Sequence, residues 1–203
     1  MSVRYYDEAL LNKIRSWVLD PNMRVLGTRD TKQLFSMVAD QTNDRPITLP
    51  LITISRNSSV DIYETRKAPR SFDGKMVGAN AQQALSLTSI DIGLKYTIDI
   101  YTRYDDEGDE YMRNFVYKLI NKPNLEITIP YNGYNHKHMS HLRLLSPVED
   151  NSDVPQKFIH DQFSRWTLNI EIDNAHLFGA PVSQNWSISE PQVNTQNNKE
   201  GEK

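Results

Sequence analysis

The sequence lacks cysteine altogether among its 203 residues. This absence excludes disulfide bonds, thiolate catalysis and zinc or iron–sulfur sites built on cysteine ligands. No apolar run approaches the roughly 18 residues that a transmembrane helix requires, so we expect no membrane partner. The first residues, MSVRYYDEALL, show neither the basic and apolar stretches nor the cleavage site of a secretory signal. We therefore expect a chain that assembles in a reducing compartment.

A large excess of one charge is also missing. Lys and Arg total 23 and Asp and Glu total 26, which gives a formal net charge of -3. A general nucleic-acid binder needs a strongly basic balance, so that class of function is disfavoured. Hydrophobic residues make up 38% of the chain, which is enough for a substantial core. The length and composition predict one folded domain with appendages.

Three helices are predicted from the spacing of apolar residues and from the capping and helix-breaking residues around them. Residues 5–18 place Tyr6, Leu10, Ile14, Trp17 and Val18 on one stripe. A short helix over 31–39 would be capped by Asp30 or Thr31. After a break at Gly108, a helix over 109–121 would end before Pro123. Its predicted apolar stripe contains Met112, Phe115, Val116, Leu119 and Ile120.

Strands are predicted over 47–54, 94–101, 125–129, 141–145 and 165–172. The clearest, 94–101, would turn Leu94, Tyr96, Ile98 and Ile100 inward and leave its other face wet. We also expect Trp166 and Phe115 to share one core. The element order predicts an α+β fold, with a mixed or antiparallel sheet and helices packed on one face.

We expect a single domain over 1–182 that includes a long protruding arm over 55–89. The arm is a poorly periodic segment, and loops of that length are commonly functional. Residues 183–203 are rich in Ser, Gln, Asn, Glu and Lys, which predicts a flexible tail.

Catalytic motifs are scarce. Glycine-rich phosphate loops and the GxSxG elbow are missing. The histidine-rich stretch HKHMSH contains His136 and His138, but the preceding Asn and Gly residues favour a loop over a metal site. We therefore expect no catalytic residue, cofactor or metal.

The acidic run at 105–110 fails as a calcium loop, because Gly108 is its fourth residue and Val116 its twelfth. Such residues suit a helix N-terminus, where the helix dipole favours negative charge. An acidic contact patch for a neighbouring subunit is the alternative.

Four stretches carry a family resemblance: LKYTIDIYTRYDDEGDEYMRNFVYKLIN, LPLITISRNSSVDIYETRKAP, SPVEDNSD and FSRWTLNIEIDNAHLFGAPV. In this order of motifs, over about residues 45–182, the chain resembles the tail terminator, or tail sheath stabiliser, of contractile-tailed bacteriophages. The resemblance implies a non-enzymatic virion protein at the neck-proximal end of the tail, assembled in the host cytoplasm. Family members form a hexameric ring that caps the tail tube and sheath and joins the neck, and DNA only passes through the lumen.

Subunit contacts in such a ring are expected to involve the arm and the acidic run. The candidate interface residues are Arg56, Glu64, Arg66, Lys67, Arg70, Asp105, Asp106 and Asp109. We expect the cations Arg66, Lys67 and Arg70 to pair with the three aspartates of a neighbouring copy.

Two other functions stay open. One is a different neck, connector or tail-tube-like ring protein. The other is a metal-dependent hydrolase that uses His136, His138 and Asp153.

Overall fold

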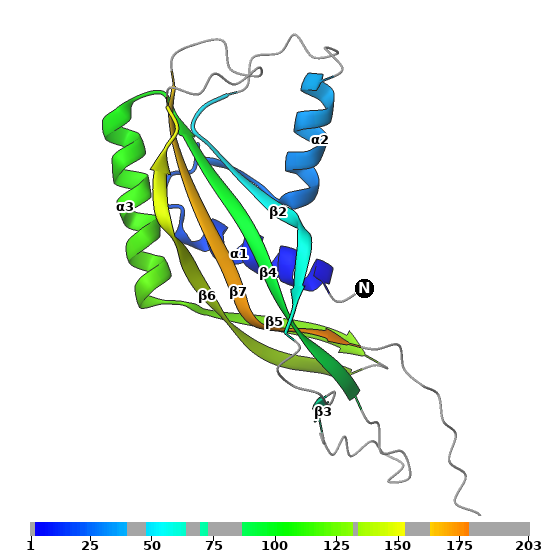
Figure 1. The fold of residues 1–203 in the computed structure, drawn as a ribbon. Helices are drawn as coiled ribbons and strands as arrows, with labels where there is room; N and C mark the ends of the chain where they lie inside the picture. Colours follow the sequence, from blue (N-terminus) through cyan, green and yellow to red (C-terminus); the bar gives the residue numbers. More distant parts are fainter. Residues whose placement is uncertain are drawn as a thin grey trace, which may run out of the picture.

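The computed structural model describes residues 3–39, 48–63, 70–72, 87–131, 134–152 and 163–178, which form three helices and one mixed sheet (Figure 1). The elements are α1 (Val3–Trp17), β1 (Arg24–Leu26), α2 (Thr28–Ala39), β2 (Leu51–Ile62), β3 (Arg70–Phe72), β4 (Leu87–Thr102), α3 (Asp105–Asn121), β5 (Asn124–Tyr131), β6 (Tyr134–Asp150) and β7 (Ser164–Phe178). The strand order is β1-β2-β4-β7-β6-β5, and β3 pairs with β4. The β1–β2 pair is parallel and the other pairs are antiparallel, so the mixed sheet of the predicted α+β fold is confirmed.

The main core lies between one face of the sheet and helices α1 and α3. In α1, Tyr6, Leu10, Ile14 and Trp17 are buried, as the helical periodicity predicts. In α3, Phe115 is fully buried and packs edge-to-face against Trp17, with 5.8 Å between ring centroids. Trp166 of β7 packs against the same cluster, which confirms its predicted place beside Phe115.

The opposite face of the sheet is not exposed to solvent throughout. The prediction that one face of β4 points into solvent is therefore wrong. Asp99 and Tyr101 alternate with the inward residues of β4, yet both are buried. Tyr101 and its cross-strand neighbour Leu51 form a second apolar cluster, against which Leu34 of α2 packs. Helix α2 therefore covers the face opposite α1 and α3, and the helices are not all on one face.

Asp99 is buried because β7 supplies its partners. Arg165 donates from Nε and Nη2 to Asp99 Oδ1, at 3.2 and 3.0 Å. Thr167 donates its hydroxyl to the same oxygen at 2.7 Å. A buried carboxylate is tolerated when its hydrogen bonds are satisfied in this way.

Helix α3 begins at Asp105 and not at 109, and Gly108 does not break it. A Cβ at Gly108 would lie 2.8 Å from Ser164 Oγ and 2.9 Å from Thr102 Oγ1. Glycine is needed here because the first turns of α3 approach the sheet closely. Phe115 and Leu119 of the predicted stripe are buried, whereas Ile120 is 66% exposed and does not belong to it.

Several other boundaries differ from the prediction. Helix α2 starts at Thr28, so neither Asp30 nor Thr31 is its cap. Strand β1 was not predicted, and β6 is far longer than 141–145.

The predicted arm is partly sheet. Strand β2 continues to Ile62 through a register shift between Arg56 and Val60, which explains the poor periodicity there. Strand β3 lies within the arm, and β4 already begins at Leu87. Residues 64–69 and 73–86 of the arm and the tail at 183–203 lie outside the described residues.

Candidate assembly surface

The outward side of α3 is an acidic stripe with large apolar side chains. Residues spaced three or four apart lie on one side of a helix. The outward residues in this spacing, which we call the α3 face, are Asp106, Asp109, Glu110, Arg113, Tyr117 and Ile120. Tyr117 is 67% exposed, and the three acids and Arg113 are also exposed. Exposed aromatic and aliphatic groups gathered on one helix are typical of a contact surface.

The acids of this helix have no partners within the described part of the chain. Asp105, Asp106, Asp109 and Glu110 are exposed, and no ion pair among the described residues involves them. Asp105 and Asp106 lie in the first turn of α3, which confirms the prediction that the acidic run occupies a helix N-terminus. Their negative charge is therefore available to another molecule.

The inward side of α3 is fixed to the segment that follows α1. Tyr111 donates its hydroxyl to Asp20 Oδ2 at 3.0 Å, and Lys118 Nζ donates to the Trp17 carbonyl at 2.6 Å. Burial, followed by the nearby Asp20 carboxylate, raises the pKa of Tyr111 to about 12. These contacts hold the helix in one position, so the α3 face is presented rigidly.

Arg56, one of the predicted interface residues, has a partner within its own chain. Its Nη1 lies 2.6 Å from Asp7 Oδ2 within the same chain, and its side chain is only 25% exposed. Tyr96 donates its hydroxyl to the other Asp7 oxygen at 2.8 Å. Burial first, and then the Asp7 charge, raise the pKa of Tyr96. Arg56 therefore fastens β2 to α1, and its place in an interface stays a prediction.

The described part of the structure does not show the other predicted cations beside the α3 acids. Glu64, Arg66 and Lys67 lie outside the described part of the chain, and Arg70 belongs to β3 with a side chain that is not described. Of the predicted set, the structure brings together Asp105, Asp106 and Asp109.

A second charged surface was missed by the sequence analysis. Arg24 of β1 and Arg29 and Lys32 of α2 are exposed, and no ion pair among the described residues involves them. We call these three residues the cationic patch. Arg29 and Lys32 are three residues apart on a helix and therefore lie on one side. The spacing was visible in the sequence, but the late predicted start of α2 concealed it.

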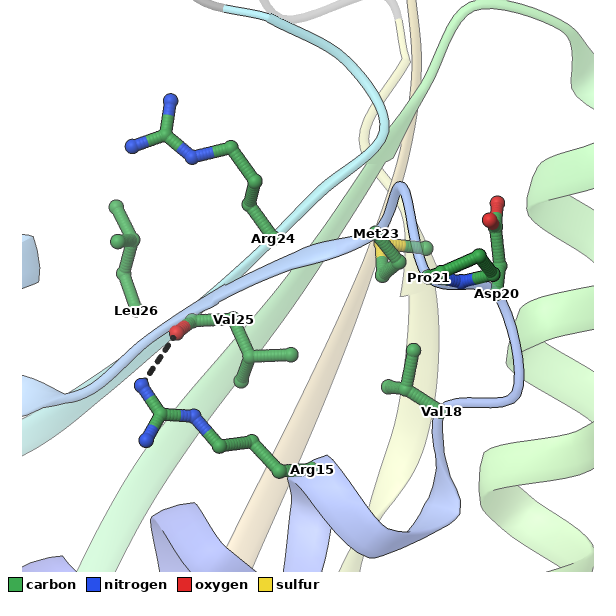
Figure 2. A pocket seen from close by; sticks show the side chains of 8 residues that line it. All are labelled: Arg15, Val18, Asp20, Pro21, Met23, Arg24, Val25 and Leu26. Carbon is green, nitrogen blue, oxygen red and sulfur yellow. Dashed lines mark hydrogen bonds between the residues drawn. The ribbon is translucent and has the colours of Figure 1, made fainter.

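A shallow groove of about 400 Å³ adjoins the cationic patch (Figure 2). Arg15 lies at one side of it and donates to the Val25 carbonyl at 3.3 Å. The lining residues are Arg15, Val18, Asp20, Pro21, Met23, Arg24, Val25 and Leu26. The groove thus combines apolar walls with two guanidinium groups and the carboxylate of Asp20.

The HKHMSH stretch lies in strand β6 and not in a loop, so that prediction is wrong. The His138 side chain is buried, and its Nε2 lies 2.7 Å from the Asn174 carbonyl oxygen and 3.0 Å from Ser140 Oγ. Its ring lies 4.3 Å from that of His176, whose Nδ1 is 2.8 Å from Asp91 Oδ1. Sequence reasoning missed His176 and Asp91, because they meet only through strand pairing.

This histidine cluster ties α1 to the sheet, since Tyr6 accepts a hydrogen bond from the His176 amide at 2.7 Å. The side chain of His136 and residue Asp153 lie outside what the structure describes. Within the described ranges, no group of three or more His, Asp or Glu side chains is arranged to hold a metal ion.

Further apolar side chains are exposed at the strand ends remote from α3. They are Val60, Ile62, Ile90, Met139 and Leu177. Ile90 and Leu177 are directly paired across β4 and β7. Their exposure makes this region a second possible contact area.

No protein-family model matches the chain, and no curated protein shows significant similarity to it. Within the described residues, no helix has the length and apolar character needed to cross a membrane.

Proposed function

We propose that this chain is a structural ring subunit of a contractile bacteriophage tail, acting as a tail terminator at the neck-proximal end of the virion. In this role identical copies form a hexamer that meets the tail tube, the sheath and the neck, and DNA passes through the lumen. The resemblance of residues 94–121 to that family supports the proposal. The observation that carries it is the α3 face, where Tyr117, Ile120 and acids without an ion pair in the described part of the chain are exposed on a helix fixed by its inward side.

The buried carboxylates favour a structural role over an enzymatic one, because other side chains already engage them. The buried carboxylate of Asp99 is engaged by Arg165 and Thr167. Glu171, also buried, accepts from Tyr63 Oη at 2.7 Å and from Arg143. Groups engaged in this way stabilise the fold and are not directed at a substrate, because a catalytic group must reach the proton or atom that it acts on.

A different neck, connector or tail-tube-like ring protein would use the same type of surface. Only the position of the ring in the virion separates that function from a tail terminator. The hydrolase hypothesis gains no support from His138, because its Nε2 already lies within hydrogen-bond distance of a carbonyl oxygen and a hydroxyl.

The test is the mass of the purified full-length protein, measured by light scattering and native mass spectrometry and followed by electron microscopy. We expect a ring of six copies, and labelled protein at the junction of tail and neck in virions. A monomer that binds stoichiometric zinc and is missing from virions would overturn the proposal.

A further inference from the structure

We propose that the α3 face of one copy packs against the cationic patch and the adjoining groove of a second copy of this chain. This inference rests on the proposed ring function and names the contact that builds the ring. It names Arg24, Arg29 and Lys32 as partners of the α3 acids, and the pairing of the arm cations stays a separate prediction.

The first argument is charge complementarity between the acids of the α3 face and the cationic patch, neither of which forms an ion pair among the described residues. The α3 face and its first turn carry Asp105, Asp106, Asp109 and Glu110, against one cation, Arg113. The Arg113 Nε donates to the Asp109 carbonyl within the helix. The cationic patch and the groove carry four exposed cations, Arg15, Arg24, Arg29 and Lys32, against two acids, Asp20 and Asp30, and so keep a positive balance. Opposite potentials of this kind steer association and select the partner.

The second argument is the apolar complement. On the α3 face, Tyr117 and Ile120 lie about two and three helical turns beyond Glu110, and each is about two-thirds exposed. The groove beside Arg24 offers Val18, Val25 and Leu26 as apolar walls. Buried aromatic anchors, and not rim charges, supply most of the affinity of an interface. The acids would therefore orient the contact, and the apolar residues would stabilise it.

The third argument is placement. Helix α2 packs on β1 and β2 at one end of the sheet order, while α3 packs on β4, β6 and β7 (Figure 1). Asp20 of the groove accepts the Tyr111 hydroxyl from the inward side of α3, whereas the α3 face is the outward side, so the two surfaces are distinct although they are close within one copy. A contact between two different patches of identical copies is heterologous, and it generates a ring when the rotation closes.

The test uses two full-length variants with reversed charges. One is Asp106→Lys, Asp109→Lys and Glu110→Lys; the other is Arg24→Glu, Arg29→Glu and Lys32→Glu. Each variant alone places like charges together at every contact. We expect the dissociation constant for self-assembly to rise about 100-fold or more, since like charges at an interface are repelled by several kcal/mol. Mixing the two variants restores opposite charges at every contact, so we expect assemblies in which they alternate.

Two controls separate the contact from other effects. Arg4→Glu with Lys137→Glu changes exposed charges elsewhere on the surface and should leave assembly unchanged. Thermal melting of each variant alone verifies folding.

If the wild type forms rings and both reversed variants form them equally well, this contact is wrong while the ring function stands. If reversal prevents assembly but the mixture does not recover, the two surfaces do not meet each other. A wild type that is monomeric at every concentration and salt, and is missing from virions, overturns both proposals.

Discussion

The truncation Phe115→Ala tests the packing of α3 on the sheet most directly. Phe115 is fully buried and forms an edge-to-face pair with Trp17. Buried Phe→Ala substitutions typically lower the free energy of unfolding by about 3–5 kcal/mol, and aromatic pairs add to burial. We expect a loss of about 4 kcal/mol. That is a large share of the roughly 5–15 kcal/mol that stabilises a native domain.

The matched control is Ile120→Ala in the same helix. Ile120 is 66% exposed in the single chain but belongs to the proposed contact, so in protein dilute enough to be monomeric its truncation should change the free energy of unfolding by no more than about 0.5 kcal/mol. Phe and Ile have similar helix propensities, both below that of Ala, so the two variants gain comparable propensity. The difference between them therefore isolates the effect of burial.

The assay is urea unfolding, followed by circular dichroism and by tryptophan fluorescence, at one fixed protein concentration because assembly shifts apparent stability. If Phe115→Ala does not fold, Phe115→Leu keeps most of the apolar volume and should show a smaller loss. A loss below about 1 kcal/mol for Phe115→Ala, or losses equal to those of Ile120→Ala, would show that α3 does not pack as described.

Three further outcomes are expected. Gly108→Ala should lower the free energy of unfolding by about 1–2 kcal/mol in urea titrations, because the clash with buried hydroxyl groups outweighs the gain in helix propensity of roughly 1 kcal/mol; an increase would contradict the close approach. Tyr96→Phe should lower it by about 1–2 kcal/mol in the same titrations, since a hydrogen bond to the Asp7 carboxylate is lost while Arg56 still pairs with Asp7. The raised pKa of Tyr111, about 12 against 10.0, means that the native state keeps this proton while the unfolded chain loses it. Its stabilising effect is therefore complete below about pH 10 and is lost as pH rises through 12, and Tyr111→Phe should flatten the fall in stability over that interval.

Periodicity predicted the elements whose buried residues follow one another along the chain. In α1, Tyr6, Leu10 and Ile14 recur at helical spacing, and in β4 the inward residues alternate strictly. In both cases the pattern is local, because one face of the element meets one apolar surface. Such elements can be predicted from a single sequence.

The sequence predictions failed at residues whose environment depends on a partner far away in the sequence. Asp99 appeared to be a solvent-facing residue, but Arg165, 66 positions away, makes it a buried acceptor. Gly108 appeared to be a helix breaker, but its missing Cβ lets α3 approach β4 and β7. His138 appeared to belong to a polar turn, but a carbonyl of β7 accommodates it inside the sheet. Tertiary contacts override local propensity at these positions.

The candidate interface was half predictable for the same reason. The exposure of Asp105, Asp106 and Asp109 follows from their place at a helix start, which the sequence shows. The availability of Arg29 and Lys32 depends on α2 beginning at Thr28, and no capping residue pattern indicated that start. The ion pair of Arg56 was not predicted, because its partner Asp7 lies on α1, 49 residues earlier.

The two proposed contact surfaces are mechanically linked within each copy. Asp20, which accepts the Tyr111 hydroxyl, lies four residues before Arg24 of the cationic patch, and Arg24 continues into β1 of the sheet. Helix α3 and the cationic patch are therefore held to the same short segment and the same sheet. A fixed relation between them fixes the rotation from one copy to the next. In a heterologous assembly that rotation decides between a closed ring and an open filament. If the proposed contact forms, the size of the ring is thus a property of this fold and does not require a template to set it.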